Sequence, residues 1–156
     1  MPRITYFAVE KLVDPELRGA LRDAAKQGVP APESQAVRAH APDILRAYTR
    51  ALERTYRHGV CDSEIKELCR SAIVHGDADP RDEREHAAVD YALAIDRDPK
   101  VADSALWDRL HQHFAEDELV ELGWFCGLMV GQHRWLRTIQ IGDREVQTLN
   151  RAGLLT

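Results

Sequence analysis

The chain has 156 residues, of which 44% are hydrophobic and 30% are charged. These proportions are typical of a soluble globular protein and too apolar for a disordered one, and the length predicts a single domain of roughly the usual 100–150 residues. The formal net charge of −5 argues against a general nucleic-acid binder, which usually carries a basic face.

The cysteines and the apolar segments indicate the compartment. The chain has three cysteines, Cys61, Cys69 and Cys126, and no two of them are separated by the short spacing of a metal-binding or redox pair. Their odd number and spacing favour a reducing environment over a disulfide framework or a zinc site. The N-terminus lacks the apolar region of a signal peptide, and the longest apolar run, residues 119–131, is shorter than the ~20 residues of a membrane span. We therefore expect a cytoplasmic protein with no membrane partner. The excess of Arg over Lys is typical of GC-rich bacterial genomes.

Nearly all of the chain predicts helices, because apolar residues recur at the helical period between Asp, Pro and Gly signals. The predicted helices span residues 14–28, 34–39, 42–59, 62–76, 79–96, 103–114 and 116–139. A weak alternation over residues 3–9 is the only candidate strand. The pattern predicts an all-α, single-domain bundle of about six or seven helices over residues 1–142. Residues 143–156 are a tail that either docks as an arm or frays.

The last predicted helix contains Gly123, Gly127 and Gly131 at four-residue intervals, which places them on one face. Each interior glycine costs ~1 kcal/mol of helix stability relative to alanine, so three in register indicate a backbone that approaches closely. That backbone belongs either to the same chain or to a second subunit.

The end of the same helix carries polar, basic and aromatic side chains. His133 is a candidate acid or base, Arg134 or Arg137 can bind a carboxylate as a fork, and Trp135 adds an aromatic wall. Alternatively, this is an amphipathic helix end whose cations complement the C-terminal dipole.

A second candidate site lies on the predicted helix 62–76. Glu67, Ser71 and His75 share a face opposite its apolar stripe. Glu67 and His75 are ~12 Å apart along the axis, so a substrate or Ser71 would have to lie between them. The alternative for His75 is a simple C-terminal cation before Gly76.

Several other titratable residues allow narrower predictions. Glu121 interrupts an apolar helix and is either a buried carboxylate with a raised pKa or an outward-facing one. Cys61 is the cysteine expected to be exposed near a helix N-terminus, whereas Cys69 and Cys126 are expected in the core. His111 and His113 point to nearly opposite faces, so we expect no metal site.

The order of six segments resembles the carboxymuconolactone decarboxylase/alkylhydroperoxidase D-like family. The segments are PESQAVRAHAP at residues 32–42, EIKELCR at 64–70, DEREHAAVDYA at 82–92, LWDRL at 106–110, EDELVELG at 116–123 and GQHRW at 131–135. The resemblance implies a small all-α fold that forms homo-oligomers, with Glu67 at the position of the proton-relay glutamate. Redox members carry a Cys-x-x-Cys and a nearby histidine after the Glu-Leu segment, and this chain lacks that segment. A dithiol peroxidase cycle therefore cannot run within the chain.

Two functions follow as hypotheses. The first is a cofactor-free lyase- or isomerase-type enzyme that uses acid–base chemistry on a small organic acid or related metabolite, by decarboxylation, isomerisation, elimination or cyclisation. Its acid–base residues would be Glu67, His133 and, secondarily, His75, and its substrate contacts would be Arg134, Arg137, Ser71 and Trp135. The second is a non-catalytic oligomeric binding or assembly relative. A third possibility is that the missing segment leaves a widened cavity for a larger hydrophobic ligand. Because the absence of the segment would uncover apolar surface, we also expect another chain to cover Val74 and the Trp124/Phe125 region.

Overall fold

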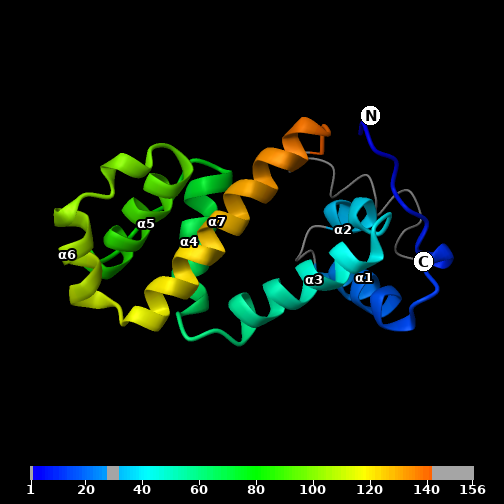
Figure 1. Cartoon of the computed structure of the whole chain (residues 1–156), viewed down its shortest axis with the longest axis horizontal. Helices are drawn as coiled ribbons and strands as arrows, with labels where there is room; N and C mark the ends of the chain where they lie inside the picture. The colour runs from blue at the N-terminus through cyan, green and yellow to red at the C-terminus, as the bar shows by residue number, and fades with distance from the viewer. Residues whose placement is uncertain (1, 28–31, 142–156) are drawn as a thin grey trace. The chain divides into compact units, whose positions relative to one another are not determined.

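The computed structural model describes residues 2–27 and 32–141, and within these ranges the protein contains seven α-helices and no strand (Figure 1). The prediction of an all-α fold is confirmed. The helices are α1 Pro15–Gln27, α2 Pro32–Arg38, α3 Pro42–Leu52, α4 Ser63–Val74, α5 Glu83–Asp96, α6 Ser104–His113 and α7 Glu116–Thr138. None of the described helices has the length and hydropathy needed to cross a membrane. The predicted tail, residues 143–156, lies outside the described residues.

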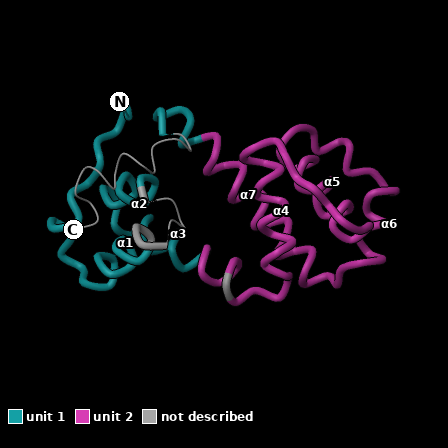
Figure 2. The backbone as a smooth tube through the Cα atoms, turned by 180° about the vertical axis from the view of Figure 1, so that it is seen from behind, with its two compact units in different colours: residues 1–51, 135–156 teal, residues 52–134 magenta. Residues whose placement is uncertain are grey.

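The backbone divides into two compact units (Figure 2). Unit 1 combines both ends of the chain, Met1–Ala51 and Trp135–Thr156, and unit 2 is the continuous segment Leu52–Arg134.

Unit 1 has its own apolar core, which begins at the N-terminal segment. The core residues are Val9, Leu12, Leu17, Leu21, Ala39 and Leu45, with Phe7 packed against them. The predicted start of α1 is correct, because the Asp14 carboxylate accepts the Glu16 N–H at 2.9 Å. Residues 3–9 form no strand. Their backbone instead bonds to other segments of the unit, with Arg3 N–H donating to the Ile139 carbonyl at 2.9 Å and Phe7 N–H to that of Ala36 at 3.0 Å.

Helix α2 buries polar side chains that the sequence did not single out. Gln35 and Arg38 are almost fully buried. The Arg38 guanidinium donates to Gln35 Oε1 at 3.3 Å and lies 3.8 Å from the centre of the Tyr48 ring. These contacts satisfy part of the guanidinium and offset the cost of burying a charge.

Unit 2 is built around the close pairing of α4 and α5. The α5 residues that face the core are mainly small, which allows the two helices to approach closely: Ala87, Ala88, Ala92 and Ala94 are all buried. Figure 1 shows α7 running beside α4, with α5 and α6 to the left of them in this view. The predicted start of α5 at Asp79 was wrong. The helix begins at Glu83, and Asp82 is its cap, accepting the Glu85 N–H at 2.9 Å.

The segment before α4 departs from a regular helix. The predicted helix 42–59 ends as α3 at Leu52, and a π-helical turn, Glu53–Arg57, follows it. Asp62 occupies the N-cap position of α4. The Asp62 carboxylate makes no cap hydrogen bond and accepts Arg84 Nη1 at 2.7 Å instead. The π turn brings Tyr56 to α4 and α7, where its ring lies 5.8 Å from that of Phe125.

Candidate functional site

The sequence-predicted site residues fall into separate places. Glu67 and Ser71 lie on α4 with His75 as its C-terminal cap, and His133 and Arg134 lie on α7 of the same unit. Trp135 and Arg137 belong to unit 1. There, Trp135 packs with its ring centre 5.1 Å from the guanidinium of Arg38.

Glu67 is held by two neighbours. Arg70 Nε lies 3.0 Å from both carboxylate oxygens of Glu67, Arg70 Nη2 lies 2.5 Å from Oε1, and the Tyr56 hydroxyl donates to Oε2. The hydrogen bond from Arg70 is the main cause that lowers the Glu67 pKa, although partial burial opposes it. Burial, together with the adjacent carboxylate, raises the pKa of Tyr56 to about 12. At neutral pH this cluster is therefore an ionised carboxylate between a cation and a neutral phenol.

Ser71 and His75 stabilise the end of α4. The Ser71 hydroxyl donates to Asp77 Oδ1 at 3.2 Å, and the His75 backbone N–H donates to the Ser71 carbonyl at 2.8 Å. The charge of His75 contributes a minor part of the lowering of the Glu67 pKa. Ser71 thus ties α4 to the following loop.

On α7, His133 and Arg134 differ in their contacts. Arg134 Nη2 donates to the Asp96 carbonyl and lies 3.3 Å from Asp96 Oδ1. The His133 side chain is partly buried, and its imidazole makes no hydrogen bond or ion pair with any residue in the described ranges. No hydrogen bond or ion pair links the His133 and Glu67 side chains among these residues.

The most buried charged side chain among the described residues was missed by the sequence analysis. Lys66 on α4 is 0% exposed and forms an ion pair with Glu121 on α7. Its ammonium group also donates to the Thr55 carbonyl. The available signal was Glu121, a single charge within the apolar stretch of α7.

Glu121 joins α7 to the loop before α4. Its carboxylate accepts the Val60 N–H at 2.8 Å and the Cys61 N–H at 3.1 Å. A Cβ atom at Gly59 would overlap this carboxylate, so the loop needs a glycine there. The hydrogen bonds from Lys66 and the two backbone amides outweigh desolvation and lower the Glu121 pKa. The alternative of a buried Glu121 with a raised pKa was therefore wrong.

The cysteines are buried thiols. Burial raises the pKa of Cys61 to about 11, so the expected exposed and activated thiol was wrong. Cys69 and Cys126 lie in the core as predicted. The adjacent Cys126 thiol and burial both raise the pKa of Cys69, whose Sγ lies 3.4 Å from the Ala88 carbonyl. Such thiols are poor nucleophiles at neutral pH.

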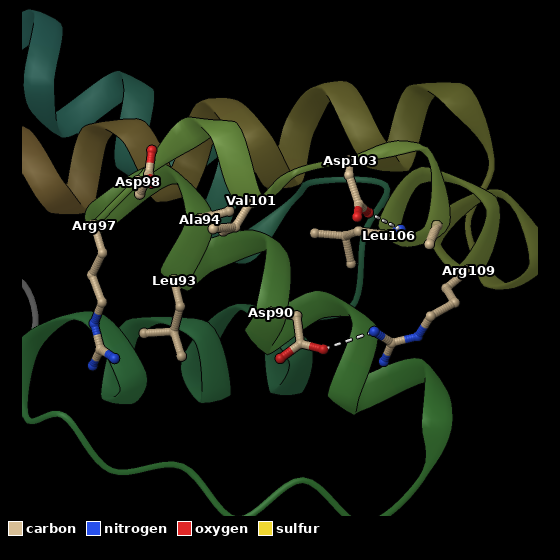
Figure 3. Close-up of a pocket in the computed structure, with 10 residues that line it drawn as sticks. Asp90, Leu93, Ala94, Arg97, Asp98, Val101, Asp103, Leu106 and Arg109 are labelled. Carbon is tan, nitrogen blue, oxygen red and sulfur yellow. Dashed lines mark hydrogen bonds and ion pairs between the residues drawn. The ribbon is translucent and has the colours of Figure 1, made fainter.

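An open pocket of about 460 Å³ lies between α5, α6 and the connection that joins them (Figure 3). Most of its polar groups already serve the fold. Asp90 accepts Arg109 Nη1 at 2.8 Å, and Asp98 and Asp103 accept backbone N–H groups at the starts of the next two helical segments. The pocket therefore has few polar groups left to orient a ligand.

A second pocket, of about 500 Å³, lies beside the N-terminal half of α7. Its lining residues are Thr55, Glu116, Asp117, Val120, Glu121 and Trp124. Val120 is 72% exposed and Trp124 is 49% exposed. Neither pocket is lined by a sequence-predicted site residue.

The glycines of α7 do not behave alike. A Cβ atom at Gly123 would lie 2.5 Å from the Tyr91 hydroxyl, whereas at Gly127 or Gly131 it would meet no atom within 4 Å. Phe125 is fully buried in unit 2, so the expectation that another chain covers it was wrong. Trp124 is left exposed, and Val74 is partly buried.

Within the described part of the chain, no group of three or more His, Cys, Asp or Glu side chains is placed to hold a metal ion. Comparisons with protein-family models, with curated proteins and with solved structures found no match for this chain.

Proposed function

We propose that this protein is a cytoplasmic relative of the carboxymuconolactone decarboxylase/alkylhydroperoxidase D-like proteins that serves as a homo-oligomeric assembly module. The carrying observation is the exposed apolar surface of α7, where Val120 and Trp124 border a pocket of about 500 Å³. Exposed apolar surface of this kind is typical of protein–protein contacts. The three buried thiols with no Cys-x-x-Cys fit a role without dithiol chemistry.

A sedimentation-velocity series over a wide range of protein concentrations tests the assembly function. We expect a species larger than the monomer that dissociates on dilution, because apolar surface must be removed from water for association to be favourable. A chain that stays monomeric at the highest concentration contradicts the proposal.

A cofactor-free acid–base enzyme acting on a small organic acid is the second candidate. The observation that favours it is the Tyr56–Glu67–Arg70 cluster, in which a half-exposed carboxylate is oriented by a phenol and a guanidinium. An ionised Glu67 suits proton abstraction better than proton donation, since its pKa is lowered. His133 or His75 would then supply the acid, with Ser71, Arg134, Arg137 and Trp135 as candidate substrate contacts.

A thermal-shift screen with small organic acids separates the two candidates. If the enzyme function holds, a ligand raises the Tm of the native chain, and Glu67→Gln and His133→Ala each abolish the shift. Asp108→Asn is the matched control, because it changes a carboxylate on α6 outside the cluster and should leave the shift intact. A ligand shift that survives in Glu67→Gln contradicts a site at this cluster.

A further inference from the structure

One face of α7 is exposed along most of the part of the helix that lies in unit 2. We call it the outer stripe, and its residues are Asp117, Val120, Trp124, Gly127, Gly131 and Arg134. The spacing alternates between three and four residues, which keeps all six on one side of the helix. The space above both glycines is open within the chain.

The outer stripe is symmetric about a point between Phe125 and Cys126. Each residue on one side has a counterpart equally far away on the other: Asp117 with Arg134, Val120 with Gly131, and Trp124 with Gly127. Every such pair is complementary, because an acidic side chain corresponds to a basic one and a large apolar side chain to a glycine. A helix with this order is complementary to its own antiparallel copy.

We propose that the outer stripe binds the outer stripe of a second copy of this chain, with the two α7 helices antiparallel about a two-fold axis. This rests on the proposed assembly function and specifies its interface. Trp124 of each chain fills the open space over Gly127 of the other, and Val120 does the same over Gly131. A two-fold interface is formed by the same patch on both subunits, which is what a self-complementary stripe requires.

The ends of the stripe determine the direction of the pairing. In the antiparallel arrangement Asp117 of one chain meets Arg134 of the other, whereas a parallel pair would bring like charges together. The contacts of Arg134 with the carbonyl and the carboxylate of Asp96 hold its guanidinium in place, and a guanidinium has five N–H donors, which leaves donors for a further carboxylate. Asp117 is exposed, and one of its oxygens accepts the Glu118 N–H at 3.0 Å.

A larger side chain at Gly127 tests the apolar part of the interface. Gly127→Met places a side chain where the partner's Trp124 must lie, and we expect the dissociation constant to rise at least ~30-fold, as for loss of a central anchor. Gly19→Met is the matched control, since a Cβ atom at Gly19 on α1 also meets nothing within 4 Å. It should associate like the native chain.

Exchanging charges tests the ends of the stripe. The Asp117→Arg protein and the Arg134→Glu protein should each associate more weakly than the native chain, because like charges then face each other. An equimolar mixture of the two should form a heterodimer, because both end pairs then combine an acid with a base. Circular dichroism of each variant shows whether its helices are intact.

Disulfide cross-linking tests whether the two α7 helices pair in the antiparallel direction. Asp117→Cys and Arg134→Cys proteins should form a disulfide with each other in a mixture but not with themselves, since residues 17 positions apart along α7 are separated by ~25 Å. A parallel pair would cross-link each variant to itself and overturn the proposal. An oligomer that tolerates Gly127→Met and both charge changes overturns the α7 interface and leaves the assembly function standing. A native chain that is monomeric at every concentration overturns both.

Discussion

The two faces of α7 both carry charged residues and glycines, but the surroundings of these residues differ. On the inner face, which packs against the rest of unit 2, Glu121 forms an ion pair with Lys66, and Tyr91 occupies the space beside Gly123. On the outer face, Asp117 and Arg134 are exposed, and no atom of the chain occupies the space beside Gly127 and Gly131. A charge or a glycine in a helix therefore indicates neither core nor surface by itself. The two faces differ in whether the same chain supplies the opposite charge and the side chain that packs beside the glycine.

The largest effect is expected from removing the buried cation of the inner face. Lys66→Ala leaves the Glu121 carboxylate without its ion pair, and loss of one partner of a buried pair costs about 3–5 kcal/mol. Urea unfolding should show this loss in the free energy of unfolding. Lys100→Ala, on the exposed turn before α6, is the matched control and should change stability by less than ~0.5 kcal/mol. Equal effects of the two substitutions would contradict a structural role for Lys66.

A smaller change in the free energy of unfolding should distinguish Gly123 from Gly127. In an Asp117→Arg background, which removes the contribution of association, Gly123→Ala forces Tyr91 to shift and should destabilise the chain by about 1–2 kcal/mol. Gly127→Ala in the same background should stabilise it by ~0.5–1 kcal/mol, because alanine is the better helix former and has space. Thermal or urea unfolding of both variants measures the difference. The same sign for both would show that the two glycines are equivalent.

The smallest effect concerns a carboxylate that pairs near the surface. Glu67 is 45% exposed, so its pair with Arg70 should contribute only ~0.2–1 kcal/mol. Because the folded-state pKa is lowered, this contribution is present above the ordinary pKa of 4.5 and is lost as the pH falls through the folded-state value. Glu67→Gln should therefore be less stable than the native chain at pH 7 and equal to it at pH 2. A difference that persists at pH 2 would assign the effect to packing.

The sequence predicted most helices because their signals are local. Asp14 and Asp103, each at the start of a predicted helix, cap α1 and α6, and the 3.6-residue period placed the core residues of α4 and α7. The start of α5 was misplaced because Asp79-Pro80 and Asp82 offer similar local signals, and it is Asp82, in an extended conformation, that accepts the Glu85 N–H.

The candidate site was less predictable because it depends on partners far apart in the sequence. Glu67 was identified on α4, but the Tyr56 hydroxyl reaches it through a π-helical turn that no local pattern indicated. Lys66 was overlooked because its burial depends on Glu121. Charge alone also did not reveal that Arg38 lies over the Tyr48 ring.

The composition of unit 1 from both chain ends has a consequence for biosynthesis. The hydrogen bond from Arg3 N–H to the Ile139 carbonyl cannot form until Ile139 has left the ribosome. Unit 2 is continuous, so all of its residues emerge before unit 1 is complete. Domains usually fold in the order in which they are synthesised. Here the N-terminal part of unit 1 is translated before unit 2, but it reaches its C-terminal contacts only after all of unit 2 has been synthesised.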